Sequence, residues 1–437
     1  MVFNSSFLIP HSSFLILHSS FLIQMKYFII AGEASGDLHG SRLIAELRRR
    51  DPEAQFRFFG GDLMAQSAGV EPIVHYRNMA FMGFVNVLLN IDKIFRIQRL
   101  AERELIDFKP DKVVLIDYPG FNLRFAKFVK HNLPSAEVDY YIAPKLWAWK
   151  EYRLKSIKRY VDRMFTIFPF ETEWFGSRGY GVEYVGNPSV DSVSAFMNED
   201  FDEAQFRVEN GLDSRPIVAL LAGSRRQEIR SCLPIMVQLV ERYPDYQFVI
   251  AAAPGIEPEF YQTLVGTHYS PPVLGGIDVG VRAESSLLML CRATRKSTKS
   301  MVEDRGGIKI LYRSTYSLLR IAHAAVVNSG TATLETALFR VPQVVVYKVF
   351  GGRLTMLLKP LFIKTPWVSL VNIIAGREVV TELLAHNYTL SRTDVELRTI
   401  LADGNRRQQI LQSYDQIIHT LGPAGADARC AEKIYKG

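Results

Sequence analysis

Short apolar runs alternate with helical patterns along most of the chain, beginning at residue 25. The first three apolar runs cover residues 26–32, 112–122 and 138–149. The helical patterns that follow them cover 40–50, 123–133 and 150–161 in the same order. Two further apolar runs cover 163–170 and 182–188. The runs lack the polar alternation of a strand with one solvated face, so each is expected to be buried on both faces. Such strands, separated by helices, predict a parallel sheet with helices on both sides.

A second series of the same kind follows a polar stretch. Its runs and helices lie within residues 216–229, 246–255 and 324–348. Because 437 residues are enough for two domains, we predict an α/β fold of two Rossmann-like domains facing a cleft, with ligands beyond the carboxyl ends of the strands. The predicted parts are an N-terminal domain over 25–190, a linker over 191–214, a C-terminal domain over 215–375 and C-terminal helices over 376–437.

Two segments fall outside this scheme. Residues 1–24 contain a nearly repeated sequence motif, SSFLIP, HSSFLIL and HSSFLIQ, and end just before Met25. Their apolar runs are too short to span a bilayer and no basic residue precedes them, which argues against a signal peptide. We interpret them as a non-native extension translated from upstream repeat DNA; the alternative is a membrane-adhering tail. Residues 270–307 show no clear periodicity and are expected to form an irregular insertion.

The composition is that of an ordinary globular protein with a mild basic excess. The chain is 48% hydrophobic and 22% charged, with a net charge of +7, which favours anionic partners such as nucleotides or phospholipid headgroups. It carries no zinc-finger spacing, RNP-type motif or long Lys/Arg run, so nucleic acid is not expected as a partner. The three cysteines lie far apart without a CxxC pair, which fits a reducing cytoplasm.

The segment NSGTATLE carries the strongest local signal for a ligand. It follows a buried strand and opens a helix, whose exposed N–H groups and dipole suit a diphosphate. The hydroxyls of Ser329, Thr331 and Thr333 add donors around Gly330, and Glu335 is placed to take a pair of ribose hydroxyls. The alternative is an ordinary helix N-cap.

The segment LLAGSRRQEI repeats this arrangement one strand away. Gly223, Ser224 and Arg225 follow an apolar strand and precede a helix. An arginine at a strand end that faces the cleft neutralises a pyrophosphate. The alternative is a solvated arginine on a turn.

Two strand ends in the first half of the chain carry acidic groups. Asp117 ends the run VVLID and is well placed as a general base, or alternatively as a cap for the next helix. The loop AGEASGDLHG lacks the spacing of a dinucleotide-binding glycine loop. If the nucleotide lies in the second domain, Glu33, Ser35 and Asp37, with Asn122, either shape the acceptor side of the cleft or hold the loops themselves.

The stretch FMGFVNVLL is apolar nearly all round and is followed by Lys93, Arg96 and Arg99. It predicts either a buried helix or a surface that contacts lipid, with the cations meeting lipid phosphates. The candidate lipid-contacting residues are Phe81, Met82, Phe84, Val85, Leu88 and Leu89.

No metal or cofactor is expected. The one D-x-D motif, at residues 200–202, lies in the polar linker away from any strand end. We therefore expect a metal-free reaction in which a helix dipole and Arg225 stabilise the leaving group.

The motifs taken together resemble lipid-A-disaccharide synthases. The matching words are AGEASGDLHG, MGFVNVL, IDYPGFN, APKLWAWK, FPFE, GSRRQEI, SGTATLE and VSLVNIIAGREVVTELL, in order from Met25 to about residue 390. The resemblance implies an inverting transfer of diacylglucosamine from UDP-2,3-diacylglucosamine to 2,3-diacylglucosamine 1-phosphate, on a glycosyltransferase-B fold. It also implies a cytoplasmic enzyme bound peripherally to the inner membrane, and a dimer intertwined through its C-terminal helices. These helices are expected either to pack back on their own chain or to be swapped in the dimer.

The resemblance assigns roles to particular positions. Asp117 matches the base proposed for the family, and Arg225, Glu335 and Asn372 match residues of the nucleotide site. Two rival functions remain open: another UDP-N-acetylglucosamine-using transferase or epimerase of the same fold, and a sugar-nucleotide-binding protein without catalysis.

Overall fold

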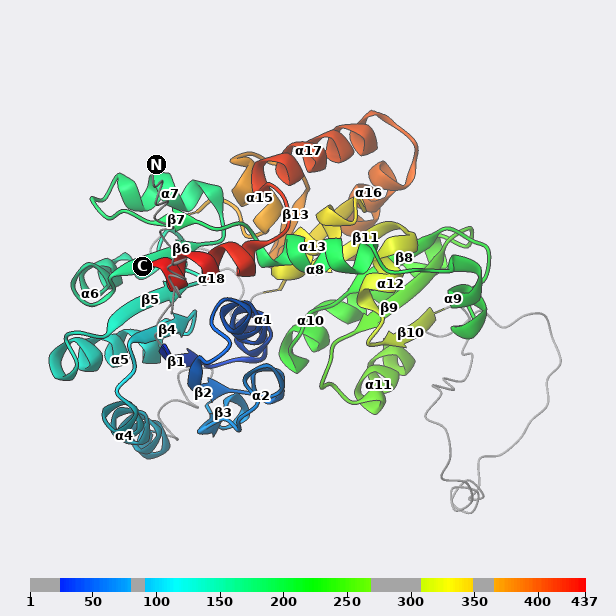
Figure 1. The fold of residues 1–437 in the computed structure, drawn as a ribbon. Coiled ribbons are helices and arrows are strands. Elements are labelled where there is room, and N and C mark those ends of the chain that lie inside the picture. The colour runs from blue at the N-terminus through cyan, green and yellow to red at the C-terminus, as the bar shows by residue number, and fades with distance from the viewer. Residues whose placement is uncertain (1–23, 80–90, 269–307, 349–364) are drawn as a thin grey trace, which may run out of the picture.

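Two parallel sheets form the framework of the chain (Figure 1). The computed structural model describes residues 24–79, 91–268, 308–348 and 365–437. The first sheet has the order β3-β2-β1-β4-β5-β6-β7 and comprises β1 (Lys26–Ala31), β2 (Gln55–Gly60), β3 (Val74–His75), β4 (Lys112–Ile116), β5 (Glu137–Tyr141), β6 (Arg163–Thr166) and β7 (Glu183–Tyr184). The second has the order β10-β9-β8-β11-β12-β13 and comprises β8 (Ile217–Leu221), β9 (Gln247–Ala252), β10 (Ile308–Tyr312), β11 (Ala322–Asn328), β12 (Gln343–Tyr347) and β13 (Glu382–Leu384).

Helices connect the strands and cover the sheets. Those up to the second sheet are α1 (Ala34–Arg50), α2 (Asp62–Ala68), η1 (Tyr76–Asn78), α4 (Ile91–Phe108), α5 (Pro119–Asn132), η2 (Glu151–Arg153), α6 (Leu154–Tyr160), α7 (Pro169–Gly176), α8 (Pro188–Met197) and α9 (Glu203–Glu209). The later ones are α10 (Arg226–Val237), η3 (Val240–Arg242), α11 (Pro258–His268), α12 (Thr315–Ile321), α13 (Thr331–Leu338), α15 (Leu370–Ala375), η4 (Ala385–Asn387), α16 (Leu390–Leu401), α17 (Asn405–Leu421) and α18 (Ala426–Lys436).

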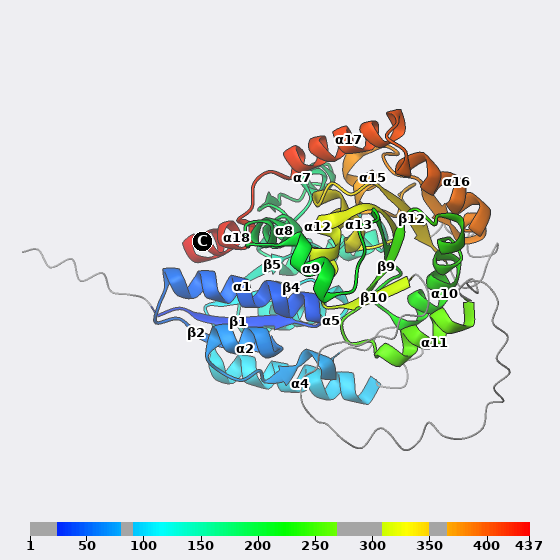
Figure 2. The same ribbon diagram turned by 90° about the vertical axis from the view of Figure 1, so that its right-hand side faces the viewer.

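The first sheet is buried on both faces, as the unbroken apolar runs predict. Successive residues of β1 point to opposite faces: Tyr27 and Ile29 pack with α1, α2 and α18, while Phe28 and Ile30 pack with α4, α5 and α6. All four side chains are fully buried. Figure 2 shows α1 and α4 on opposite sides of β1.

Each sheet reverses its strand order at one point. In the first sheet β1 pairs with both β2 and β4, and in the second β8 pairs with both β9 and β11. Ligands of such folds bind at this switch point, outside the carboxyl ends of the strands. The predicted pair of Rossmann-like domains is therefore confirmed, and the topology fixes where each should hold a ligand.

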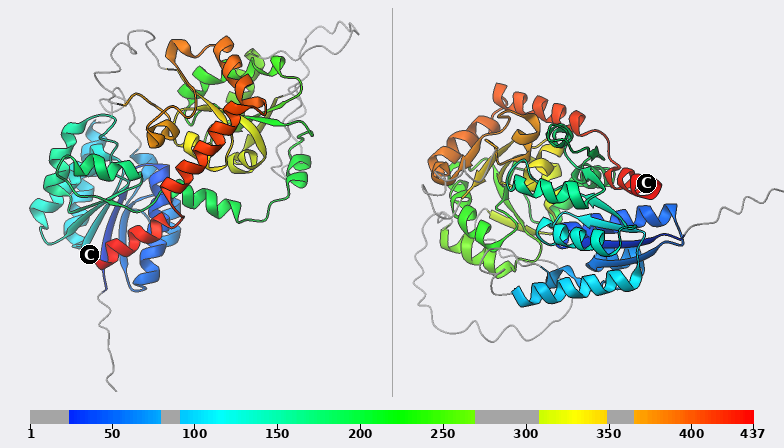
Figure 3. Two further views of the ribbon diagram at one scale, coloured as in Figure 1. Left: turned by 90° about the horizontal axis from the view of Figure 1, so that it is seen from above. Right: turned by 90° about the vertical axis from the view of Figure 1, so that its left-hand side faces the viewer.

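The C-terminal helices return from the second domain to the first. Figure 3 shows α17 running along the second domain and α18 lying against the first, beside α1. The Tyr141 hydroxyl of β5 donates to Asp427 at 2.7 Å, and Arg50 of α1 donates to the Ala428 carbonyl at 3.0 Å. These helices thus pack back on their own chain; a swap between two chains stays a prediction.

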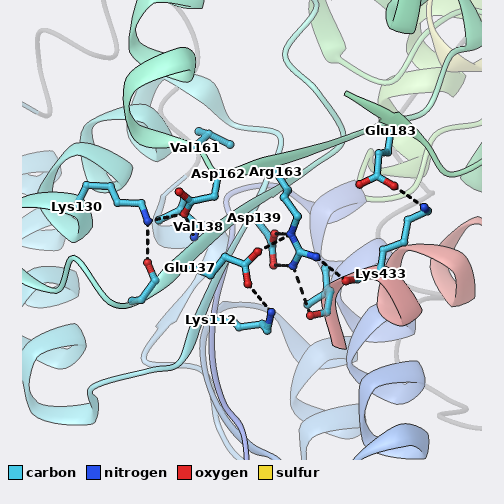
Figure 4. A network of polar contacts seen from close by, with 12 residues as sticks. Lys112, Lys130, Glu137, Val138, Asp139, Val161, Asp162, Arg163, Glu183 and Lys433 are labelled. Carbon is cyan, nitrogen blue, oxygen red and sulfur yellow. Dashed lines mark hydrogen bonds and ion pairs between the residues drawn. The ribbon is translucent and has the colours of Figure 1, made fainter. Parts of the chain in front are cut away.

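A network of charges fastens the last turn of α18 to the first sheet (Figure 4). The Nε atom of Arg163 lies 2.6 Å from Glu137 and 2.9 Å from the buried Asp139, and Nη1 donates to the Lys433 carbonyl at 2.7 Å. Lys433 in turn pairs with Glu183. Because the network lies at the amino ends of the strands, it is structural and lies away from the switch point.

Two predicted boundaries need correction. The expected linker holds most of α8 and all of α9, so it is structured rather than a plain connection. β13 lies within the stretch expected to be helical and adds an edge strand to the second sheet, so this domain extends past residue 375. Three residues are too short for a periodic signal. Residues 1–23 and the expected insertion at 270–307 lie outside the described residues.

Candidate active site

A cleft of about 470 Å³ opens where the two switch points face each other. The first domain contributes Glu33 and Ser35, which follow β1. The second contributes the loops after β8, β9 and β11 and the start of α12. The lining side chains of the second domain include Gly223, Ser224, Arg225, Glu228, Pro254, Thr315, Ser329, Gly330, Thr331 and Glu335.

The wall after β11 has the geometry expected for an anion. Gly330 has φ 155°, a conformation open mainly to glycine, and a β-carbon there would meet nothing within 4 Å. The glycine is thus required by the backbone rather than by crowding. Thr331 begins α13 and is exposed, so the helix start faces the cleft with its first N–H groups.

The loop after β8 differs in one respect from the prediction. The Glu228 carboxylate accepts the N–H groups of Ser224 at 3.0 Å and Arg225 at 3.3 Å. These backbone donors are engaged by an internal acid, so the loop offers an anion its Arg225 guanidinium, which is 60% exposed and pairs with Glu228 at 3.3 Å, rather than its backbone. Glu228 was missed, although an acid three residues after the N-cap is the spacing of a capping box.

Glu335 faces the cleft with a partner that the sequence did not reveal. The Tyr316 hydroxyl donates to its Oε1 at 2.8 Å. Burial raises the pKa of Glu335, and the Tyr316 hydrogen bond opposes that rise. Tyr316 and its neighbour Thr315 begin α12 just after β10.

Asp117 follows β4, next to the loop that carries Glu33. The residue is exposed at the sheet edge, yet the surrounding protein removes enough hydration to raise the pKa of its carboxyl; Lys145 and the Tyr118 N–H act against that rise. Loss of hydration also raises the pKa of Glu33, Asp117 adds to the effect, and Arg225 and Lys145 oppose it. Two carboxylates and two cations from both domains therefore share one electrostatic environment.

Lys145 was missed by the sequence analysis. It is exposed in the loop after β5, within the APKLWAWK segment. The Trp147 indole of this loop donates to the buried Glu171 at 2.9 Å, which holds the loop in place. Burial raises the pKa of Glu171 to about 7. This segment served only as a motif in the sequence analysis, and no candidate residue was named within it.

Four of the predicted site residues turn inward instead of facing the cleft. Asp37 is 3% exposed and accepts the N–H groups of Gly61, Leu63 and Met64 at 2.7–3.2 Å, so it caps α2. Asn122 is fully buried and donates to the carbonyls of Ile116 and Asp117. Two roles were left open for these residues, shaping the acceptor side of the cleft and holding the loops. In this structure Asp37 and Asn122 both hold loops.

Thr333 and Asn372 also hold the fold. The Thr333 hydroxyl donates to Gly330 O at 2.8 Å and accepts the Leu370 N–H. The Asn372 amide donates to Val380 O and Glu382, and its oxygen accepts two further N–H groups. Both side chains are 0% exposed, so this structure does not present them to the cleft.

Among the remaining predicted residues, one lines the cleft and the others lie outside the described part of the chain. Ser329 lines the cleft while its hydroxyl donates to Val368 O at 3.0 Å, so it faces a ligand mainly as an acceptor. The apolar residues from Phe81 to Leu89 lie outside the described residues. Within the described part of the chain, no three His, Cys, Asp or Glu side chains gather to hold a metal ion, and no helix there is both long and apolar enough to cross a membrane.

Comparisons with known proteins agree on a single family. The family model described as lipid-A-disaccharide synthetase matches residues 27–268 and 286–431. A lipid-A-disaccharide synthase of Myxococcus xanthus is 36% identical over 416 residues, covering 94% of this chain and 97% of that protein. One of Geobacter sulfurreducens is 34% identical over 410 residues, with 93% and 95% covered.

Solved structures share the fold at low sequence identity. A UDP-GlcNAc 2-epimerase from Neisseria meningitidis, solved with UDP-GlcNAc bound, has a TM-score of 0.61 and 12% identity, covering 94% of this chain and all of that one. The calicheamicin glycosyltransferase CalG4 has a TM-score of 0.51 and 14% identity, covering 94% and 98%. At these identities the likeness concerns the fold alone. With the family match over nearly its whole length, the chain belongs to the lipid-A-disaccharide synthase family, and is a glycosyltransferase of lipid A biosynthesis.

Proposed function

We propose that this chain condenses UDP-2,3-diacylglucosamine with 2,3-diacylglucosamine 1-phosphate, giving lipid A disaccharide 1-phosphate and UDP. One observation carries the proposal. The cleft sets a helix start suited to a diphosphate, at Gly330 and Thr331, opposite Glu33 of the other domain, whose carboxylate interacts electrostatically with Asp117.

The donor lies on the second domain. Its diphosphate rests against the start of α13, with the Arg225 guanidinium as the cation. Glu335 accepts ribose hydroxyls with one carboxylate oxygen while Tyr316 holds the other. Because Glu335 lines the cleft, its other carboxylate oxygen takes the ribose hydroxyls in this proposal.

The acceptor lies on the first domain, with its 6-hydroxyl near Asp117. The oxygen forms a bond to the anomeric carbon of the donor as its proton passes to the Asp117 carboxylate. The bond from the anomeric carbon to the UDP oxygen breaks with its electron pair, and UDP leaves from the opposite face, so the configuration inverts. A hydroxyl is far less acidic than a carboxylic acid, so proton transfer accompanies bond formation, and a raised pKa makes Asp117 a stronger base.

Arg225 and the α13 dipole stabilise the departing diphosphate without a metal ion in this proposal. In this proposal the acceptor's phosphate pairs with Lys145, which shares the electrostatic environment of Glu33 and Asp117. Turnover should therefore persist in excess EDTA, and loss of activity that Mg²⁺ restores would overturn the metal-free step.

The location of the enzyme follows from its lipid substrates. We propose a cytoplasmic enzyme that associates peripherally with the anionic inner membrane and forms a homodimer. Exposed groups on the first domain support the membrane contact: Trp149 is 49% and Tyr152 68% exposed, and Lys150 lies 4.1 Å from the Trp149 ring centroid.

Mass spectrometry of the products separates this function from its rivals. Purified chain is incubated with UDP-2,3-diacylglucosamine, with and without 2,3-diacylglucosamine 1-phosphate. The proposal predicts UDP and a disaccharide only when both are present. An epimerised sugar nucleotide without the acceptor would favour the epimerase, and bound but unchanged substrates would favour a binding protein.

A further inference from the structure

The turn that carries Asp117 has an unusual backbone. Asp117 has φ 42° and Tyr118 has φ 47°, so two successive residues other than glycine adopt the left-handed conformation. A side chain with a β-carbon rarely takes this conformation, and a pair of them persists only where the surrounding contacts impose it. The contacts that impose this turn therefore also set the direction of the Asp117 side chain.

Two buried side chains converge on the Asp117 carbonyl. The Asn122 amide donates to it at 2.7 Å and to the Ile116 carbonyl at 3.2 Å. The Tyr140 hydroxyl donates to the same Asp117 oxygen. Both side chains are 0% exposed, and the Asp117 N–H donates to the Tyr141 carbonyl at 3.1 Å. Hydrogen bonds therefore fix the peptide groups before and after Asp117.

Tyr118 seats the same turn against the glycine loop of the first strand. A β-carbon at Gly32 would lie 2.5 Å from the Tyr118 ring, so the ring lies directly over this glycine. The Tyr118 hydroxyl donates to the Met79 carbonyl at 2.7 Å. Because Gly32 precedes Glu33, the Asp117 turn and the loop that brings Glu33 to the cleft are packed as one unit.

We propose that Tyr140 and Asn122 are positioning residues that hold Asp117 in its left-handed turn and direct its carboxylate toward the acceptor. The proposal deepens the proposed function and rests on Asp117 as the base. The Tyr140 ring packs in a hydrophobic cluster with Phe28 and Phe125, where phenylalanine would fill the same space. The hydroxyl is therefore needed for the turn and not for packing.

The neighbouring residue on β5 offers a matched control. Tyr141 is also 0% exposed and its hydroxyl also makes a buried hydrogen bond, but on the opposite face, to Asp427. Tyr140→Phe and Tyr141→Phe each remove one buried hydroxyl and keep the rest of the side chain. Tyr140→Phe should lower kcat by about 10- to 100-fold with both KM values within about twofold, because a misplaced base loses orientation rather than binding. Tyr141→Phe should keep kcat while losing similar thermal stability.

Asn122→Ala should reproduce the kcat loss of Tyr140→Phe. Equal kcat in Tyr140→Phe and Tyr141→Phe, or a rise in KM instead of a fall in kcat, would overturn the positioning role. A crystal structure of the Tyr140→Phe/Asn122→Ala variant separates this inference from the function itself. We expect φ of Asp117 to leave the left-handed region, and an unchanged turn refutes the inference even if the wild type makes disaccharide. A wild type without product refutes the function instead.

Discussion

At the scale of single residues, two threonines of one motif have opposite tasks. Thr331 and Thr333 both looked like donors to a diphosphate. Residues two apart on a helix point in nearly opposite directions, so only one of them faces the cleft. Thr331 lines it, whereas Thr333 joins Gly330 to Leu370 in the interior.

Valine substitutions at these two positions should separate binding from stability. Thr333→Val leaves the Leu370 N–H without its acceptor, so the free energy of unfolding should fall by about 1–3 kcal/mol with the donor KM unchanged. Thr331→Val should raise the donor KM and leave stability within about 0.5 kcal/mol. Urea denaturation and steady-state kinetics measure both. Equal stability losses at the two positions would contradict the assignment.

Adjacent arginines allow a similar comparison at the diphosphate. Arg225 lines the cleft, whereas Arg226 pairs with Glu257 and lies 5.0 Å from the Phe260 ring centroid. A lost hydrogen bond between charged groups is worth about 1.5–3 kcal/mol, so Arg225→Ala should raise the donor KM about 10- to 100-fold. Arg226→Ala should not. A KM that responds equally to both changes would show general charge attraction instead of a specific contact.

At the scale of elements, the sequence predicted what local patterns encode. Buried strands and their following helices were visible from hydrophobic runs. Asp117 and Arg225 were visible as polar residues that follow strands, and Glu335 as an acid about one turn into the next helix. The inward turn of Asn372 was not visible, because an amide that binds ligand and one that binds backbone have the same sequence signal. The docking of α18 depends on partners far away in the chain, such as Tyr141 with Asp427, which no local pattern reports.

The buried Asp427 should make stability depend on pH. Burial raises its pKa from the ordinary 3.8 to about 6, with Asp191 adding to the rise and Tyr141 and Arg42 opposing it. The folded chain therefore binds this proton more tightly than the unfolded chain, so its stabilising effect is complete below about pH 4 and is lost as pH rises through about 6.

Asp427→Asn removes this dependence. Its stability relative to the wild type should improve by an amount on the order of 2 kcal/mol between pH 4 and pH 7, measured by urea denaturation at each pH. Tyr141 keeps an acceptor in this variant, so α18 should stay docked. If the free energies of unfolding of the two proteins changed with pH in parallel, Asp427 would be ionised in the folded chain at no cost in stability.

At the scale of the whole molecule, helices from both domains fix how the two switch points face each other. Asp191 of α8 accepts the Gly425 N–H at 2.8 Å, just before α18, and Ser192 accepts from Arg42 of α1 at 2.9 Å. Further along α8, Phe196 packs on Tyr316, the partner of Glu335. The cleft thus depends on contacts between domains as much as on either sheet.

The net charge of +7 leads to a prediction about membranes. The chain should sediment with vesicles containing anionic phospholipid and dissociate as salt rises from about 0.05 M to about 0.5 M, because screening weakens exposed charge pairs. Zwitterionic vesicles are the control. Binding that ignores both lipid charge and salt would contradict an electrostatic contact.

The proposed reaction depends most on Asp117 as the base. The deciding measurement is UDP-sugar affinity and turnover of Asp117→Asn beside the wild type. Asparagine keeps the size of the side chain but cannot take the proton, so we predict donor affinity within about threefold and a kcat lower by about 10²–10⁴-fold. A fully active Asp117→Asn enzyme would contradict the role of Asp117 as the base.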